Sequence, residues 1–386
     1  MSKQVYTFRL YPTRKQAQAL QWTLDRCREL YNAALQERRD AYRMCGTSIT
    51  YYDQANQLPE IKQDRAEYQD IHSQVLQDVL RRVDTTFKAF FARCKRGDTP
   101  GFPRYKGRNS FDSFTYPQAG FSLTPDHRVC LAKIGSIKVK LHRQIKGTIK
   151  ICTVKREGDA WYIVLACEVE HEPMEENAEA VGIDLGLLHF ATLSDGSTIE
   201  NPRYLRKAEQ RLAHLQQALS RKKRGSHHRR KAAGQVAKAH RKVANQRGDF
   251  LHKQSRKLVN AYGTMVFEAL QPAHMSKRPK PKQDENGKYL PNGAAAKGGL
   301  NKSIVDAGWG IFQQFCTYKA ANAGRDVLFV NPNSTSQVCS GCGQVRKKDL
   351  SERWHSCECG TELDRDHNAA LNILALGRRV QAAQAS

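Results

Sequence analysis

Two close pairs of cysteines constrain the fold of this chain more than any other pattern. Cys339 and Cys342 form a C-x-x-C pair, and fourteen residues separate it from a shorter C-x-C pair, Cys357 and Cys359. Two thiolate pairs with flanking glycines are typical of a tetrahedral Zn²⁺ site, which is structural because four protein ligands leave no open position. The alternatives are a redox pair or four unligated thiols. The other seven of the eleven cysteines are scattered singly, which predicts reduced thiols in the core.

The charge of the chain predicts a polyanionic partner. The 386 residues include 63 Lys and Arg against 38 Asp and Glu, which gives a formal net charge of +25. Such an excess disfavours a compact state unless a polyanion neutralises it, and nucleic acid releases counterions when Lys and Arg bind its phosphates. An anionic membrane surface would instead favour a basic amphipathic helix with a continuous apolar face, which the sequence lacks. Charge for solubility alone is the weaker interpretation of so large a surplus.

The length allows two or three domains, and 40% hydrophobic residues is a globular value. No segment approaches the roughly 18 uninterrupted apolar residues of a spanning helix. The first residues, MSKQVYTFRLYP, lack the apolar run of a secretory signal. We therefore expect a cytoplasmic protein with no membrane partner.

Hydrophobic periodicity predicts helices and strands in both halves of the chain. In the first half, apolar residues recur with the period of a helix after Arg14 and again over about 69–95. The strands expected there lie at 5–10, 148–154 and 161–169.

In the second half, an apolar strand ends at Asp184 and a basic helical region follows over about 203–258, with a break near Gly225. The other elements expected there are strands at 263–270 and 326–330 and helices at about 302–323 and 366–379. Residues 276–300 are rich in Pro, Gly, Lys and Asn, which indicates a flexible loop.

Three carboxylates occupy positions in these elements from which they could converge. Asp184 ends one strand, Glu268 lies in a second, and Asp366 opens the last helix. Three carboxylates on an α/β scaffold can hold two Mg²⁺ ions about 4 Å apart, one activating water and the other stabilising the leaving 3′ oxygen of a phosphodiester. Each acid is equally explained as an ordinary strand-end residue, and Asp366 also as a helix N-cap. Spacing alone leaves both interpretations open.

Several motifs follow one another in a fixed order over nearly the whole chain. The most specific is the last, Asp364-Arg-Asp366-His-Asn-Ala-Ala-Leu-Asn-Ile373. The others are FRLYPTRKQ at 8–16, FKAFF at 87–91, GFPRYK at 101–106, GIDLG at 182–186, the strand with Glu268, DAGWG at 306–310 and the cysteine ribbon. In this order they resemble the TnpB family of transposon-encoded nucleases, which are relatives of the type V CRISPR effectors.

The resemblance implies an α+β multidomain fold. It consists of an N-terminal β-barrel-like module with an inserted helical domain, then an RNase H-like (RuvC) α/β domain with an inserted zinc ribbon. Asp184, Glu268 and Asp366 would be the catalytic residues and Mg²⁺ ligands, with Asp364 ranked after Asp366. The implied boundaries are 1–12 and 106–175 for the β-rich wedge-like module, 13–105 for the helical recognition domain, 180–335 and 361–380 for the RuvC domain, 336–360 for the zinc ribbon, 276–300 for the flexible loop and 381–386 for a tail.

The resemblance also implies the partners. In this family a guide noncoding RNA from the transposon end directs cleavage of double-stranded DNA next to a short adjacent motif, which the protein reads while base pairing reads the target. Charge alone supports a polyanion but does not specify RNA. These partners would place the protein in the prokaryotic cytosol, associated with the nucleoid.

Candidate nucleic-acid contacts are aromatic, amide and basic side chains, each of which is also explained by packing or solvation. Tyr51 could stack on a base, and Gln77 could reach an adenine edge in a groove. The basic candidates are Arg221, Lys222, Lys223, Arg224, Arg229, Arg230 and Lys231.

Two other functions stay open beside an RNA-guided endonuclease. One is an RNA-guided DNA-binding regulator with little nuclease activity, and the other is a transposase or an accessory protein of one. The family often has an acid directly after the catalytic Glu, where this chain has Ala269. The three carboxylates and Asp364 are all present, which favours the endonuclease.

Overall fold

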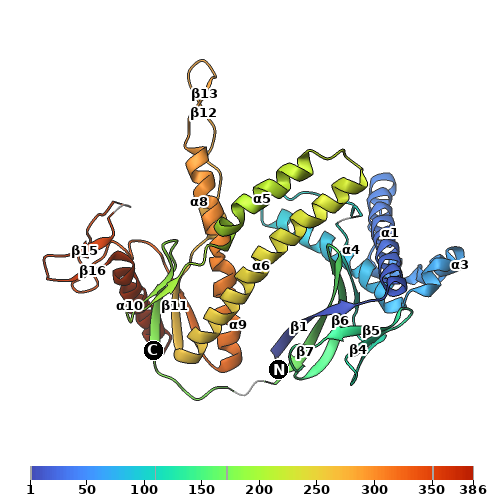
Figure 1. Cartoon of the computed structure of the whole chain (residues 1–386), viewed down its shortest axis with the longest axis horizontal. Helices are drawn as coiled ribbons and strands as arrows, with labels where there is room; N and C mark the ends of the chain where they lie inside the picture. The colour runs from blue at the N-terminus through green and yellow to red at the C-terminus, as the bar shows by residue number, and fades with distance from the viewer. Residues whose placement is uncertain (1, 109, 171–172, 350–351, 386) are drawn as a thin grey trace. The chain divides into compact units, whose positions relative to one another are not determined.

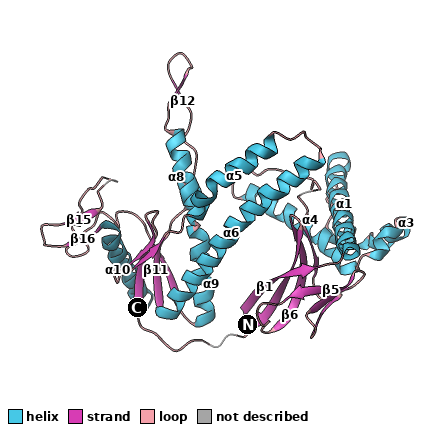
Figure 2. Cartoon of the chain, viewed as in Figure 1, coloured by secondary structure: helices cyan, strands magenta, loops and turns pink. Residues whose placement is uncertain are grey.

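The computed structural model describes residues 2–108, 110–170, 173–349 and 352–385. These form two compact units, one ending at Glu170 and the other comprising the rest of the chain. Each unit contains a sheet with helices packed against it (Figure 1 and Figure 2). The α+β class expected from the sequence is therefore confirmed.

The first unit is built on a seven-stranded sheet in the order β2-β6-β7-β1-β5-β4-β3, with every pairing antiparallel. The sheet is open, because β2 and β3 form its edges, so the barrel-like module is not a closed barrel. Alternate residues of β7 are buried, as a strand with one face on the core requires. The strands are β1 (Ser2–Tyr11), β2 (Ser113–Tyr116), β3 (Phe121–Thr124), β4 (Arg128–Leu131), β5 (Gly135–Lys140), β6 (Thr148–Glu157) and β7 (Ala160–Val169).

The helices of the first unit contribute apolar side chains to one core with this sheet. The longest begins with a capping box, in which Thr13 and Gln16 each accept a backbone hydrogen bond from the other. A helix was expected from residue 69, but a short 3₁₀ turn precedes it and the α-helix begins at Ser73. The elements are α1 (Arg14–Cys45), α2 (Tyr51–Asn56), α3 (Leu58–Asp64), η1 (Ala66–Asp70) and α4 (Ser73–Lys95).

The second unit is built on a mixed five-stranded sheet in the order β10-β9-β8-β11-β14. The last three strands of that order are parallel, and β9 runs antiparallel to β8. The strands are β8 (Ala180–Asp184), β9 (His189–Leu193), β10 (Thr198–Glu200), β11 (Thr264–Glu268) and β14 (Asp326–Val330). The predicted strand at 326–330 is confirmed residue for residue.

Helices cover both faces of this second sheet, as Figure 1 shows for α9 and α10 on opposite sides of β11. Met265 and Phe267 of β11 belong to the core shared with α6 and α9. Val266, between them, packs with Ile373 of α10. Helices on this scaffold are α5 (Tyr204–Ser220), α6 (His227–Ala261), α7 (Pro272–Met275), α8 (Ala294–Ala307), α9 (Trp309–Ala323) and α10 (Arg365–Ala385).

Two expectations for this unit need correction. The helix predicted over about 302–323 is two helices, since Gly308 has a φ of +72° and ends α8 before α9 begins. The segment 276–300 is also not irregular throughout. It contains a short hairpin of β12 (Lys282–Gln283) and β13 (Tyr289–Leu290), and α8 already begins at Ala294. The predicted flexibility of this segment is untested.

Glycine allows α10 to lie directly on β8 and β11. A Cβ atom added to Gly182 of β8 would lie 2.1 Å from the carbonyl oxygen of Ala370 and 2.6 Å from the backbone nitrogen of Leu374. One turn later in α10, a Cβ on Gly377 would lie 2.4 Å from a methyl group of Val266. Only glycine fits at such a separation, because both obstacles at Gly182 are backbone atoms.

We expect Gly182→Ala to lower the free energy of unfolding by about 1–3 kcal/mol or more, because α10 must move away from β8. Gly248→Ala is the matched control. Gly248 lies within α6, where an added Cβ would meet no atom within 4 Å, so alanine there should stabilise by about 0.5–1 kcal/mol. Thermal and urea unfolding of the two variants measures the difference. Equal stability of both variants would contradict the close packing.

Candidate active site and cysteine cluster

Two of the predicted carboxylates lie next to each other at the carboxyl ends of parallel strands. Ile183 of β8 pairs in register with Phe267 of β11, and each strand ends one residue later, at Asp184 and Glu268. Ile183 and Phe267 point into the core shared with α6 and α9. Because side chains alternate along a strand, the two carboxylates project to the opposite face, which α10 covers.

The third carboxylate lies in the first turn of α10. Asp366 is close to the loop that follows β8, since a Cβ on Gly186 would lie 3.9 Å from its Oδ2 atom. The capping role considered for Asp366 belongs to Asp364 instead. The Oδ1 atom of Asp364 accepts hydrogen bonds from the backbone nitrogens of Asp366 at 2.8 Å and His367 at 3.3 Å. The side chain of Asp366 is thereby left available for other contacts.

The pKa values of all three acids are raised, and that of Asp184 is raised in part by the other two. Burial, and then the charges of Glu268 and Asp366, raise the pKa of Asp184 well above its usual value. Burial also raises the pKa of Glu268, and burial followed by the charge of Asp364 raises that of Asp366. A raised acid pKa means that the folded state loses stability as the pH rises through the shifted pKa and the carboxylates ionise together. A bound cation would relieve this repulsion.

The spacing of these acids differs from that of a single-ion site. In the described part of the chain, the four cysteines are the only group of three or more Cys, His, Asp or Glu whose ligand atoms all lie within 4.8 Å of one another. The three carboxylates are therefore more widely spaced. Two Mg²⁺ ions about 4 Å apart need not share all three carboxylates, so this spacing is compatible with a two-ion site.

Two side chains that sequence reasoning missed hold Glu268 in place. The hydroxyl of Thr335 donates to Glu268 Oε1 at 2.5 Å, and this hydrogen bond opposes the rise in the pKa of that carboxyl. The buried amide of Gln313, on α9, donates to the Glu268 carbonyl oxygen at 2.9 Å. Neither residue carries a sequence signal, because each matters only through a tertiary contact.

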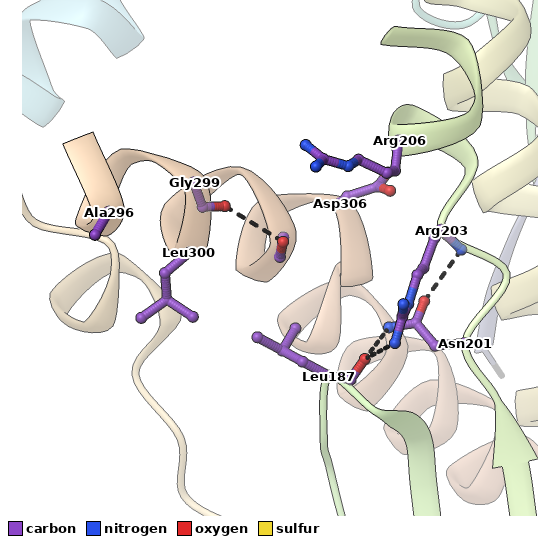
Figure 3. A pocket seen from close by; sticks show the side chains of 9 residues that line it. Leu187, Asn201, Arg203, Arg206, Ala296, Gly299, Leu300 and Asp306 are labelled. Carbon is purple, nitrogen blue, oxygen red and sulfur yellow. Dashed lines mark hydrogen bonds between the residues drawn. The ribbon is translucent and has the colours of Figure 1, made fainter. Parts of the chain in front are cut away.

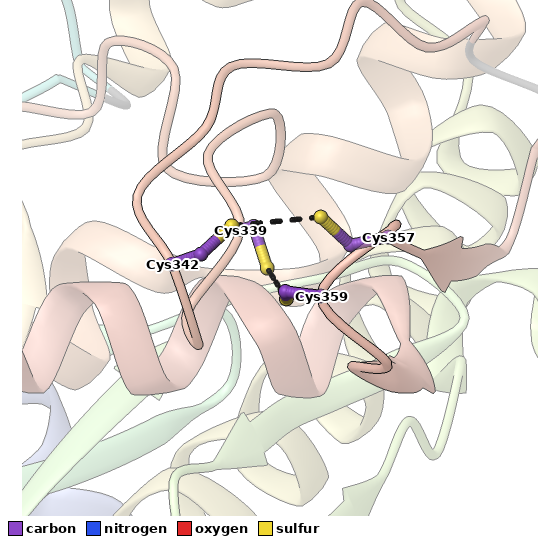
Figure 4. A group of neighbouring side chains, drawn as sticks. All are labelled: Cys339, Cys342, Cys357 and Cys359. Atoms are coloured by element: carbon purple, nitrogen blue, oxygen red, sulfur yellow. Dashed lines mark hydrogen bonds between the residues drawn. The ribbon is translucent and has the colours of Figure 1, made fainter.

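The four cysteines converge in the geometry of a metal site (Figure 4). The Sγ atoms of Cys339 and Cys359 are 3.6 Å apart, and so are those of Cys342 and Cys357. Tetrahedral zinc with bonds of about 2.3 Å places its sulfur ligands roughly 3.8 Å apart, which fits this cluster. The hydroxyl of Thr361 lies 3.1 Å from Cys359 Sγ and is the largest cause of a lowered pKa for that thiol.

Two asparagines of the last sequence motif connect this cluster to α10. The fully buried Asn368 accepts from the Ser340 backbone nitrogen at 2.9 Å and donates to the Val338 carbonyl oxygen at 2.7 Å. Asn372 donates to the same Val338 oxygen and to the carbonyl oxygen of Thr335 at 2.9 Å. The helix that carries Asp366 is therefore hydrogen-bonded to the residues on either side of Cys339, and also to Thr335, the residue that holds Glu268.

A pocket of about 440 Å³ adjoins the loop that follows β8 (Figure 3). The carbonyl oxygen of Leu187 in that loop accepts from the side chains of Asn201 at 3.0 Å and Arg203 at 3.3 Å. Arg203 adopts a left-handed φ of +48°, which costs energy for a residue with a side chain. Arg206, one turn further on, lines the same pocket with an exposed side chain. The Arg203 guanidinium therefore lies beside Leu187, three residues after Asp184, whereas the Arg206 guanidinium forms an ion pair with Glu209 at 2.8 Å.

The basic candidates of the sequence lie around the turn between α5 and α6, whose break near Gly225 is confirmed. The run from Arg221 to Arg224 is exposed, as are Arg230 and Lys231. Arg229 differs, because its guanidinium donates to the carbonyl oxygens of Leu219 at 3.0 Å and Lys222 at 2.9 Å. This residue closes the turn, so its structural explanation has direct support.

The two candidates of the first unit also differ from each other. Gln77 is exposed on α4. Tyr51 is partly buried, with the Arg81 guanidinium 5.2 Å above its ring and the Tyr52 ring at 5.3 Å. Gln77 is thus free to meet a partner without rearrangement, whereas Tyr51 already packs within the protein.

Models of known families match three parts of the chain. One described as "Probable transposase" matches residues 164–278, and one described as "Cas12f1-like, TNB domain" matches residues 309–373. A third, described as "Helix-turn-helix domain", matches residues 1–46, although the described residues there form one strand and one long helix. None of the helices that the structure describes is both long and apolar enough to cross a membrane.

A curated relative covers almost the whole chain. The Escherichia coli strain K12 protein described as "Putative RNA-guided DNA endonuclease InsQ" is 34% identical over 385 residues, which is 98% of this chain and 93% of that protein. The chain belongs to the TnpB family. A Streptomyces pristinaespiralis protein described as "Putative RNA-guided DNA endonuclease" is also 34% identical, over 97% of this chain and 89% of its own length. The resemblance drawn from the motifs is confirmed.

Solved structures support the same fold. This TnpB chain matches a chain of the "Cryo-EM structure of the Cas12f1-sgRNA-target DNA complex" with a TM-score of 0.55 and 15% identity, over 94% of this chain and 83% of that one. It also matches the "Structure of the mini-RNA-guided endonuclease CRISPR-Cas_phi3" with a TM-score of 0.52 and 9% identity, over 97% and 92%. At these identities the likeness shows a shared fold.

Proposed function

We propose that this protein is an RNA-guided endonuclease that cleaves double-stranded DNA next to a short adjacent motif. The observation that carries the proposal is the position of Asp184 and Glu268 at neighbouring strand ends, beneath the helix that supplies Asp366. Its family membership and the names of its relatives as RNA-guided DNA endonucleases support the guide and the target. The net charge of +25 supports two nucleic-acid partners.

We further propose that the second unit contains a RuvC-type, RNase H-like nuclease domain, formed by residues 180–335 and 361–380 around a ribbon at 336–360. Asp184, Glu268 and Asp366 would hold two Mg²⁺ ions, which activate water and stabilise the leaving oxygen when bound. Thr335 and Gln313 keep Glu268 in position through their hydrogen bonds. Arg203, in the adjoining pocket, would supply positive charge for the phosphates of the strand to be cut.

The same proposal gives the other parts of the molecule roles in binding nucleic acid and zinc. The β-rich module at 1–12 and 106–175 and the helical domain at 13–105 would hold the guide and read the adjacent motif, with Gln77 as an exposed candidate on α4. The basic residues Arg221–Arg224, Arg230 and Lys231 would bind phosphates. A DNA target would bring the protein to the nucleoid. Cys339, Cys342, Cys357 and Cys359 would bind a structural Zn²⁺.

The decisive experiment uses the protein purified together with RNA transcribed from its own genomic flank. We expect Mg²⁺-dependent cleavage of a matched double-stranded target, and at least a thousandfold loss of the cleavage rate in Asp184→Asn and Asp366→Asn, because water activation and leaving-group stabilisation both depend on the ions. Binding of the matched target should persist in both variants.

Asp364→Ala is the control for this experiment. Since Asp364 caps α10, its loss should lower stability by about 0.5–2 kcal/mol while leaving most of the cleavage activity. If the parent complex binds its matched target and leaves it uncut, the protein is an RNA-guided binding regulator. If transposon ends are joined without a guide, it is a transposase.

The hydrogen bond from Thr335 generates a pH prediction. This bond favours the ionised form of Glu268, so Thr335→Val should raise the pKa of that carboxyl further above its usual value. Metal binding requires the ionised form. The acidic limb of the cleavage rate against pH should therefore move to higher pH in Thr335→Val and stay in place in Thr335→Ser, which keeps the hydroxyl. An unmoved limb in Thr335→Val would show that this bond does not tune the site.

Replacement of both cysteines of the first pair tests the zinc assignment. We expect Cys339→Ser with Cys342→Ser to lose one zinc per chain by elemental analysis and to lower the melting temperature, because structural zinc contributes to the free energy of folding. Cys45→Ser, an exposed thiol on α1 outside the cluster, should keep the metal and the melting temperature. Unchanged zinc in the double variant would rule out this site.

A further inference from the structure

The first unit contains a cavity of about 790 Å³ that none of the assigned roles uses. Its walls come from the last turns of α1, the segment that follows this helix, the end of α4 and the loop beyond it. Four phenylalanines and three arginines line it, together with a tyrosine, and no acidic residue does. The composition therefore combines flat aromatic surfaces with positive charge.

The phenylalanines form a wall of rings, part of which is open to solvent. Phe102 meets Phe90 edge to face, with ring centroids 5.4 Å apart, and Phe87 lies nearly parallel to Phe91 at 6.3 Å. Phe91 is 55% exposed and Phe102 is 48% exposed. Large apolar side chains are seldom left this open as a group, and a cluster of them marks a binding surface.

A buried arginine in this cavity has an unused donor. Arg38 is only 8% exposed, donates from Nε to Gln54 at 2.8 Å and forms an ion pair through Nη1 with Asp84 at 3.2 Å. Its Nη2 atom is buried and has no hydrogen-bond acceptor among the described residues. Because Nη2 has almost no exposed surface, it is not open to a ligand in the cavity, and the Arg38 guanidinium instead lies over the Phe87 ring, 5.6 Å from the ring centroid.

We propose that this cavity captures an unpaired base of the RNA partner. The phenylalanine wall would stack on the base, and the buried Arg38, with its guanidinium over the Phe87 ring, would hold that wall in place. Arg39 and Arg43, both exposed at the cavity, would contact the flanking phosphates. The inference rests on the proposed RNA-guided function and adds to it a site and a chemical class of ligand.

The chemistry favours RNA over the DNA target. A base in duplex DNA enters a pocket only after it is unstacked and flipped out, at a cost of a few kcal/mol. A folded RNA already exposes unpaired bases in loops and bulges, and proteins recognise these by stacking on aromatic rings and guanidinium groups. The volume of the cavity lies within the range of about 300–1,000 Å³ that small-molecule sites occupy.

Substitution of Phe91 tests the proposal, since this side chain is more than half exposed and its replacement should leave the fold intact. The probe is the RNA transcribed from the genomic flank, with single-stranded and duplex DNA of matched length in separate titrations. We expect Phe91→Ala combined with Phe102→Ala to weaken RNA binding about tenfold or more, and to leave both DNA affinities within about twofold of the parent. Phe91→Trp with Phe102→Tyr, which keeps the stacking surfaces, should bind RNA like the parent.

A second measurement locates the base directly. RNA that carries 4-thiouridine should crosslink under ultraviolet light to Phe90, Phe91 or Phe102 in the parent protein, as mass spectrometry of the digested complex would show. Parental RNA affinity in the double alanine variant, with crosslinks elsewhere only, would overturn the proposal while leaving the RNA-guided function intact. An equal loss of single-stranded DNA binding would reassign the cavity to a DNA strand. A parent protein that binds no RNA would instead refute the proposed function itself.

Discussion

The contact between α10 and β8 at Gly182 is the packing interaction on which the candidate active site depends. Strand pairing fixes the positions of Asp184 and Glu268. The register between β8 and β11 determines where these two acids lie relative to each other. The third acid, Asp366, belongs to α10. This helix can lie close to the sheet because Gly182 has no side chain. A methyl group at Gly182 would push α10, and Asp366 with it, away from the sheet. The residue without a side chain is therefore as important for the geometry as the acids.

The net charge of the whole chain is positive, whereas the charge at the candidate site is negative. The chain as a whole is strongly basic, which attracts polyanions from a distance. Asp184, Glu268 and Asp366 form a small acidic region within it, where burial raises the pKa of each acid and the charges of the other two raise that of Asp184 further. A phosphate drawn in by the long-range field would be repelled at close range unless cations intervene. This contrast supports the proposal that divalent ions bind at this site.

The sequence predicted what local patterns determine. The strand ending at Asp184, the strand with Glu268 and the spacing of the four cysteines each have a signal within a few neighbouring residues, and the structure contains all of them. Thr335 and Asn372 could not be found in this way, because their partners lie far away in sequence. The capping of α10 by Asp364 rather than Asp366 was also out of reach, since it depends on which residue begins the helix. The guide RNA was expected from the family resemblance alone.

The asparagine contacts between α10 and the cysteine ribbon have a consequence for the order in which the protein matures. The ribosome produces β8 and β11 well before the ribbon, and the ribbon immediately before α10. Asn368 and Asn372 can dock only onto a ribbon whose backbone is already shaped. If a metal ion orders that ribbon, metal binding must come before α10 packs in place and positions Asp366. A chain that has not yet acquired its ion would then lack the contacts that hold Asp366 beside the strand ends of Asp184 and Glu268.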